Sequence, residues 1–153
     1  IRYWRPAPRF TQDDINDNRY SINRKLMFRL YFIVKNRETG LWEFPTGVRR
    51  NPDTMRFAAS RKFFEDMGTN LRAYFISNAP LGHIATPTPP DAPTETTFFY
   101  HVLYLKGRPP FKAKQKEWAD HAWVTRKELT EYEMAPGHKQ YLYDLLWDGF
   151  VCA

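Results

Sequence analysis

The residues best suited to chemistry lie between positions 47 and 69, in the stretch GVRRNPDTMRFAASRKFFEDMGT. Glu65 and Asp66 are adjacent carboxylates, and Lys62 precedes them by three and four positions. On a helix, side chains at these separations share one face, and carboxylates grouped in this way are suitable ligands for Mg²⁺. Because Lys62 adds a positive charge to the group, its ammonium is expected to compete with a divalent cation for both carboxylates.

The same stretch predicts a tight loop followed by one helix of roughly four turns. Asn51 is the expected N-cap, Pro52 suits the first helical position, and Asp53 favours the positive end of the helix dipole. Gly68 is expected to end the helix in the left-handed conformation. At 100° per residue the apolar arc contains Phe57, Ala59, Phe63, Phe64 and Met67, opposite the charged residues Arg61, Lys62, Glu65 and Asp66.

This spacing resembles the Nudix box. In that motif Gly is followed after five residues by Glu, and this is followed after seven residues by Arg-Glu-apolar-x-Glu-Glu-x-Gly. The matching residues are Gly47, Asp53, Arg61, Phe63, Glu65, Asp66 and Gly68, with Lys62 in place of the Glu that follows the Arg. In Nudix hydrolases the three carboxylates matching positions 62, 65 and 66 hold Mg²⁺ against a diphosphate and help to activate water. With Lys62 the face carries about −1 instead of about −3. The resemblance therefore implies a Nudix fold without hydrolytic activity, metal or other cofactor.

The remaining pattern predicts strands on both sides of this helix. Residues 24–35 form an apolar run typical of a central strand buried on both faces, followed by a turn at 36–40 and a second strand at 41–45. Further strands are expected at 71–77, 96–106 and the end of 117–125, then a short helix from 126 and a final helix along residues 138–146. This order predicts an α/β protein, and the Nudix resemblance specifies an α/β/α sandwich with a mixed sheet.

Composition limits the class of protein. The 153 residues suit one domain, and the 42% hydrophobic and 17% aromatic content excludes a disordered chain. The lone Cys152 excludes an internal disulfide and a zinc module, and no apolar run approaches the roughly 18 residues of a membrane span. Because the chain begins at Ile1 without Met, it is expected to be a processed product or part of something longer.

Basic residues are spread over two regions outside the helix. Residues 1–23 are rich in Arg, Pro and aromatics and predict an extended arm, which lies either on a partner or on its own domain. Residues 24–153 are expected to form the Nudix-like domain. Within it, residues 86–94 predict a Pro-rich surface insertion. The net charge of +6 suits an RNA partner. The basic loop at 107–116 could bind phosphate, but taken in isolation its composition favours simple solvation. The candidate RNA contacts are Arg2, Arg5, Arg9, Arg49, Arg50, Arg108, Lys112 and Lys114.

Three further segments, residues 75–83, 97–107 and 121–129, resemble the Nudix-like proteins of the large subunit of the mitochondrial ribosome. Asn-Ala-Pro-Leu-Gly-His at 78–83 and Trp-Val-Thr-Arg-Lys-Glu-Leu at 123–129 are the most specific of these. The resemblance implies a non-catalytic subunit in the central protuberance, within the mitochondrial matrix. Its implied partners are large-subunit proteins and ribosomal RNA, without a homo-oligomer.

Two other functions remain open at this point. One is an active Mg²⁺-dependent hydrolase of nucleoside diphosphate derivatives, with Glu65 and Asp66 on the metal and Glu95 or Glu117 as base. The other is a nucleotide- or RNA-binding module outside the ribosome that uses the former substrate cleft. Hydrolysis by the wild-type chain favours the first, and nucleotide affinity that persists in EDTA favours the second.

Overall fold

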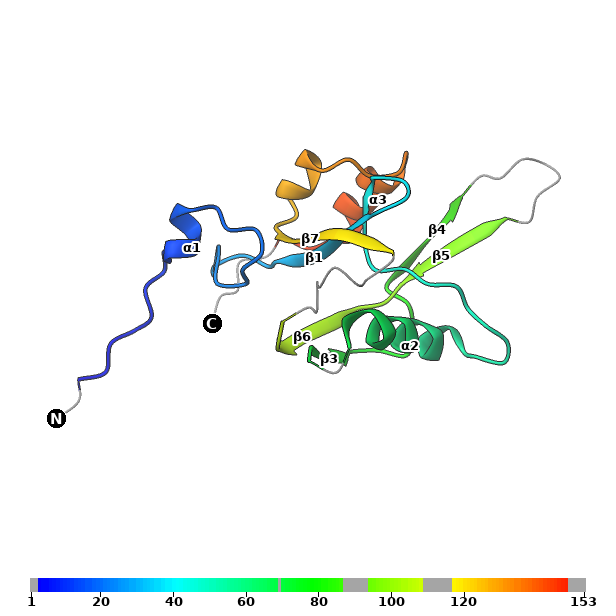
Figure 1. The fold of residues 1–153 in the computed structure, drawn as a ribbon, viewed down its shortest axis with the longest axis horizontal. Helices are drawn as coiled ribbons and strands as arrows, with labels where there is room; N and C mark the ends of the chain where they lie inside the picture. Colours follow the sequence, from blue (N-terminus) through cyan, green and yellow to red (C-terminus); the bar gives the residue numbers. More distant parts are fainter. Residues whose placement is uncertain (1–2, 69, 87–93, 109–116, 149–153) are drawn as a thin grey trace. The chain divides into compact units, whose positions relative to one another are not determined.

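The computed structural model describes residues 3–68, 70–86, 94–108 and 117–148 (Figure 1). The chain divides into two compact units. Unit 1 comprises residues 1–44 and 117–153, and unit 2 comprises residues 45–116. Among the described residues, no helix has both the length and the apolar character needed to cross a membrane.

Unit 1 is built on a three-stranded antiparallel sheet. β1, Tyr31–Asn36, lies between β2, Trp42–Glu43, and β7, Trp118–Val124 (Figure 1). The predicted central strand and hairpin are thus confirmed, although β1 is shorter than the apolar run from which it was inferred. Residues 24–30 precede the strand because Arg24, at the start of that run, is held by polar contacts and not by strand pairing.

A hydrophobic cluster of unit 1 lies on one face of this sheet. Ile33, Ala122, Val124 and Leu129 are at most 2% exposed and pack with the partly buried side chains of Trp42, Phe44, Tyr132, Met134 and Leu146. The short 3₁₀ helix η1, Glu128–Glu131, and helix α3, His138–Leu145, follow β7. Both were predicted, and Leu142 on the apolar stripe of α3 is buried. Burial of this stripe is what holds so short a helix in place.

The expected extended conformation of the N-terminal segment does not hold over its whole length. α1, Gln12–Ile15, begins with a capping box in which Thr11 and Asp14 each bind the other's backbone N–H. Further along, the Trp123 N–H donates to the carbonyl of Arg19 at 2.7 Å, so this part of the segment lies beside β7. The sequence of this segment has no clear periodicity and therefore did not predict this structure. Local side-chain capping and a backbone hydrogen bond to the edge strand β7 stabilise it instead. The division into arm and domain at residue 23 stays a prediction.

Unit 2 contains helix α2, Met55–Met67, and two antiparallel strand pairs (Figure 1). β3, Arg72–Phe75, pairs with β6, Val102–Lys106, and β4, Gly82–Thr86, pairs with β5, Glu95–Phe99. The single strand predicted for 96–106 is wrong: it divides at residues 100–101 because its two halves pair with different strands. β4 was not predicted, since its stability comes from pairing with β5 across the insertion.

The Pro-rich insertion connects these paired strands. Its residues 87–93 lie outside the described residues, but Thr86 and Glu95 on either side of it are register partners. The predicted α/β class is confirmed. Every strand pair in the described part of the chain is antiparallel, so the mixed sheet of the prediction has no parallel pair there.

Candidate functional site

Helix α2 carries the candidate chemical residues, and it begins later than predicted. Asn51 is not its N-cap: the Asp53 N–H donates to the Arg50 carbonyl at 2.7 Å and closes a turn before the helix. The N-cap is Thr54, whose hydroxyl accepts from the Phe57 N–H at 3.2 Å. The helix ends at Gly68 as predicted, but the expected left-handed α conformation is wrong: Gly68 has φ 64° with ψ −168°, and its N–H donates to the Phe64 carbonyl.

The prediction of an apolar and a charged face is only partly correct. Phe57 and Phe64 are 55% and 47% exposed, whereas Met67 is fully buried. On the charged side, Asp66 is only 9% exposed. A buried carboxylate is tolerated only with a compensating charge, and Lys62 supplies one. The helical periodicity assigned the charged side correctly, but it did not predict that Asp66 is buried with Lys62 as its partner while Glu65 stays exposed.

Arg61 joins the loop to the helix through two carboxylates. Its Nε and Nη2 donate to the same oxygen of Asp53 at 3.1 and 2.9 Å, and its Nη1 lies 3.4 Å from Glu65. Hydrogen bonding to Asp53 raises the pKa of Arg61, so the guanidinium stays charged. Arg49 supports the same turn by donating from Nε to the Asp53 carbonyl at 2.8 Å. Glu65 and Asp53, both residues of the predicted box, are therefore held by one guanidinium.

Lys62 holds the other carboxylate of the box. Its Nζ lies 3.0 Å from Oδ1 of Asp66, one helical turn further on, and both side chains are less than 20% exposed. An ammonium at this position occupies the place where a cation would meet Asp66. Among the described residues, no group of three or more His, Cys, Asp or Glu side chains is arranged to hold a metal ion. The structure thus brings the predicted box residues together as two ion-pair clusters.

The stem of Lys62 also explains the Gly at position 47. A Cβ added to Gly47 would overlap Cγ of Lys62 and lie 2.8 Å from its Cβ and Cδ. Real Cβ atoms do not approach side chains this closely, so the loop backbone and the lysine stem fit only because position 47 lacks a side chain. The loop and the helix are consequently in close contact at the ion pair with Asp66.

Gly47→Ala is expected to lower the free energy of unfolding by about 1–3 kcal/mol, the usual range for overpacking a closely packed contact. Urea denaturation of the wild-type and variant chains measures this difference. In the matched Lys62→Ala background the decrease is expected to be smaller, because the contacts with Cγ and Cδ are removed and only the approach to Cβ at 2.8 Å remains. A decrease of the same size in both backgrounds would contradict the proposed contact.

The candidate RNA contacts differ in their availability. Arg5, Arg9, Arg50 and Arg108 are exposed, whereas the guanidinium of Arg49 is bonded to the Asp53 carbonyl and to Oδ1 of Asn51. Arg2, Lys112 and Lys114 lie outside the described residues. Their assignment to RNA binding stays a prediction, and the exposed arginines of the first segment are the simplest to test.

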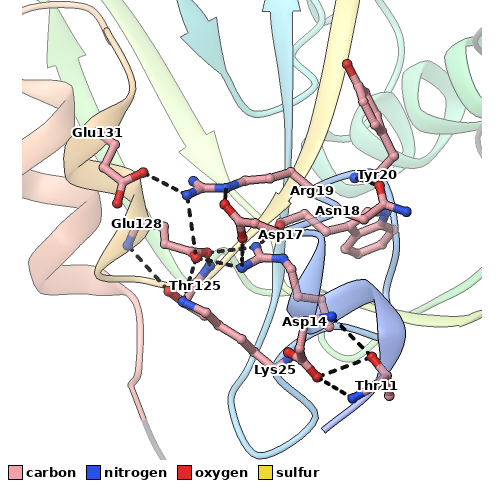
Figure 2. A network of polar contacts seen from close by, with 12 residues as sticks. Thr11, Asp14, Asp17, Asn18, Arg19, Tyr20, Lys25, Thr125, Glu128 and Glu131 are labelled. Carbon is pink, nitrogen blue, oxygen red and sulfur yellow. Dashed lines mark hydrogen bonds and ion pairs between the residues drawn. The ribbon is translucent and has the colours of Figure 1, made fainter.

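Sequence reasoning missed a polar network in unit 1 that centres on Glu128 (Figure 2). Arg24 is fully buried and donates to both oxygens of Glu128, at 2.6 and 2.8 Å. Lys25 donates to Glu128 at 2.6 Å, and the Thr125 N–H donates to it at 2.9 Å. The network fastens the segment before β1 to the start of η1, although the two are about a hundred residues apart in sequence.

One local signal for this network was present in the sequence. Thr125 and Glu128 have the Thr-x-x-Glu spacing of a capping box, and the Glu128 N–H indeed lies 3.3 Å from the Thr125 hydroxyl. That spacing predicts the local pair but gives no sign of Arg24. The basic partner could not be selected from a chain with 23 Lys and Arg residues.

Comparison with known proteins places this geometry in a family. The chain is 31% identical to large ribosomal subunit protein mL46 of Rattus norvegicus over 136 residues, covering 84% of this chain and 48% of the relative. It is 29% identical to the Bos taurus protein of the same name, again over 84% of this chain and 48% of the relative. The chain thus spans about half the length of these curated relatives.

A solved structure has the same fold. A crystal structure described as a NUDIX hydrolase from Listeria monocytogenes superposes with a TM-score of 0.52 at 14% identity, covering 76% of this chain and 80% of the other. The sequence profile of the NUDIX domain matches residues 22–145, which include the loop, α2 and every strand described above. The chain belongs to the NUDIX domain family.

Proposed function

We propose that this chain is a structural component of the large subunit of the mitochondrial ribosome, in the mitochondrial matrix. The observation that carries the proposal is its similarity, over most of its length, to relatives named as large ribosomal subunit protein mL46. In this role the domain supplies surfaces for neighbouring proteins and ribosomal RNA in the central protuberance. A fold does not by itself define a function, so the proposal also depends on the charges of the helix that carries the box residues.

The charge pattern of α2 supports a non-catalytic role. A Nudix active site needs several carboxylates free to hold Mg²⁺, whereas here Lys62 is bonded to Asp66 and Arg61 to Asp53 and Glu65. The two cations offset the charge that would attract the metal. In this proposal α2 contributes to the packing and surface of the domain. The domain serves mitochondrial translation through its contacts with neighbouring proteins and ribosomal RNA, and not through hydrolysis.

The exposed arginines support the RNA part of the proposal. Arg5 and Arg9 lie in the part of the N-terminal segment that precedes α1, and Tyr3 and Trp4 beside them are 84% and 85% exposed. Arginines bind phosphate and aromatic rings stack on unpaired bases, so the segment has the groups used to recognise single-stranded RNA. Among the described residues, this is the part of the chain where such groups are most concentrated.

Gradient sedimentation of a gently lysed mitochondrial extract tests the proposal. The chain is expected to travel with large-subunit RNA and to remain there after a moderate salt wash. If it stays at the top of the gradient as a free protein, the ribosomal proposal is wrong. Assays of the purified chain for Mg²⁺-dependent diphosphate hydrolysis, and for nucleotide binding in EDTA, then separate the two remaining functions.

Binding of the purified chain to large-subunit RNA at several salt concentrations tests the phosphate contacts. Affinity is expected to fall as salt rises, because each bound phosphate releases counterions. The double variant Arg5→Ala, Arg9→Ala should reduce the slope of log K against log salt by roughly 0.7–0.9 for each phosphate that is no longer bound. Arg72→Ala is the matched control, since Arg72 is an exposed arginine that is not among the candidate contacts. Salt-independent binding would rule out the phosphate contacts.

A further inference from the structure

Unit 1 contains a pocket of about 610 Å³, and none of the residues that line it belongs to the box of unit 2. Its walls come from the segment before β1, from β2, from β7 and from the residue after η1. The side chains that matter for its chemistry are Asn16, Tyr20, Trp42, Asp120, His121 and Tyr132. No sequence pattern indicates this pocket, because its walls come from residues 16–20, 42, 120–122 and 132, which are far apart along the chain.

Aromatic rings form much of the pocket. Trp42 and Tyr132 meet edge to face with ring centroids 4.8 Å apart, and Tyr20 and His121 meet in the same manner at 5.1 Å. The Tyr20 ring is anchored by its hydroxyl, which donates to Asp120 at 3.2 Å (Figure 2 shows Tyr20 beside Asn18 and Arg19). Rings held by such contacts offer fixed π faces, which attract flat cations as well as bases.

The charges of the lining side chains distinguish a flat cation from a nucleic-acid base as the ligand. Two further lining residues, Asp17 and Arg19, are bonded to each other at 3.1 Å, and Arg19 also lies over the Tyr132 ring, 5.7 Å from its centroid, and donates to the Tyr132 hydroxyl at 3.2 Å. Asp17 is bonded as well to Arg24 at 3.1 Å, and Arg19 to Glu131 at 2.9 Å. These charges offset one another. Asp120 accepts only from neutral donors, the Tyr20 hydroxyl and the His121 N–H, and in the described part of the chain no basic side chain forms an ion pair with it.

Lys35 on β1 is the register partner of both Asp120 and Trp42. Lys35 forms no ion pair with Asp120 within the described residues, and it is not part of the pocket lining. Burial lowers the pKa of His121, so this ring is neutral at physiological pH and adds no positive charge to the pocket. A carboxylate beside π faces favours a cation and repels phosphate.

We propose that this pocket binds a basic side chain of a partner protein, with the guanidinium of arginine as the preferred group. The guanidinium plane stacks on the Trp42 ring while its N–H groups donate to Asp120, and the Tyr132 ring, already contacted by Arg19, holds Trp42 edge to face. Arginine is preferred to lysine because its flat, weakly hydrated cation stacks on aromatic rings and donates at the same time. The pocket belongs to unit 1 alone, so the inference does not depend on the ribosomal proposal.

Titration of the isotope-labelled full chain with N-acetyl-arginine amide at low salt, followed by NMR, tests this inference. Saturable shifts are expected at the Trp42 indole and at the amides of residues 120–122. Asp120→Asn is expected to weaken binding about tenfold, the effect of losing one charge-assisted hydrogen bond. The asparagine keeps an oxygen that can accept from the His121 N–H, so the local backbone contact is retained.

Matched probes and a matched variant separate charge from shape. N-acetyl-citrulline amide has the shape of the arginine probe without its charge and is expected to bind about tenfold more weakly. Asp144→Asn, an exposed carboxylate on α3 that bonds only Gln140 in the described structure, is expected to leave binding unchanged. Equal binding of citrulline, equal binding by Asp120→Asn, or tighter binding of adenosine than of the arginine probe would overturn the proposal. Absence of shifts at the pocket would do the same.

Discussion

Glu128→Ala is expected to lower the free energy of unfolding by about 3 kcal/mol, because it removes the main counter-charge of a buried Arg24. Arg24 is fully buried and donates to both oxygens of Glu128, at 2.6 and 2.8 Å. In the variant its charge is left with the half-exposed Asp17 at 3.1 Å and the Trp123 carbonyl at 2.8 Å, so the cost is that of a poorly compensated buried cation and not the net value of the ion pair. Chemical denaturation of the wild-type and variant chains measures it.

A neighbouring residue supplies the control. Glu131 lies in the same 3₁₀ helix and pairs with Arg19 at 2.9 Å, but its side chain is 58% exposed. Glu131→Ala should therefore lower the free energy of unfolding by only about 0–1 kcal/mol. Replacing both buried partners, as in Arg24→Met with Glu128→Leu, should restore most of the stability, since no buried charge remains. Equal decreases for the two single variants would contradict the network.

The same carboxylate predicts how stability depends on pH. Burial by itself raises the pKa of Glu128, but the hydrogen bonds from Arg24, Lys25 and Thr125 outweigh it and hold the pKa well below its usual 4.5. The ionised group therefore contributes its full stability above about pH 4.5, and this contribution is lost as the pH falls below that value. In acid, the difference in unfolding free energy between wild type and Glu128→Ala should become smaller.

Lys62→Glu is expected to change the response of the chain to Mg²⁺. It removes the ammonium bonded to Asp66 and places three carboxylates at positions 62, 65 and 66 of one helix face. Without metal their repulsion should lower the melting temperature. With Mg²⁺ at a hundred times its dissociation constant, binding to the folded state alone would restore about 2.7 kcal/mol. Thermal melts at increasing Mg²⁺ should show this rise for the variant and none for the wild type.

Activity provides the second readout for position 62. If the lysine is what silenced the site, Mg²⁺-dependent hydrolysis of nucleoside diphosphate derivatives should be detectable only in Lys62→Glu. Lys62→Gln is the matched control, because it removes the ammonium without adding a carboxylate and should show neither hydrolysis nor a marked response to Mg²⁺. Hydrolysis by the wild-type chain would contradict the non-catalytic proposal.

Local features of this chain could be predicted well. The turn at 36–40 with its flanking strands, the helix that ends at Gly68, β7 and α3 all follow from periodicity and from turn or cap residues that act within a few positions. The departure at Lys62 was also apparent, because a helix places residues 62, 65 and 66 on one face whatever the rest of the chain does. The ion pair with Asp66 is the direct result of that spacing.

Features that depend on distant partners could not be predicted. The start of α2 at Met55 depends on the turn that precedes Thr54. The division of residues 96–106 depends on the pairing of β4 with its first half and of β3 with its second half. The exposed fraction of the α2 side chains could not be predicted either: Phe57 stays exposed although it is apolar, and Asp66 is buried although it is charged.

The sequence alone thus determined the α/β class, the order of its principal elements and the altered charge of the Nudix helix, because each depends on interactions within a few residues. Tertiary structure decided that Arg24 is buried against Glu128, that the stem of Lys62 lies against Gly47, and that Trp42, Asp120 and Tyr132 line one pocket. Each of these joins residues whose distance in space is set by strand pairing and packing, and no spacing in the sequence encodes that distance.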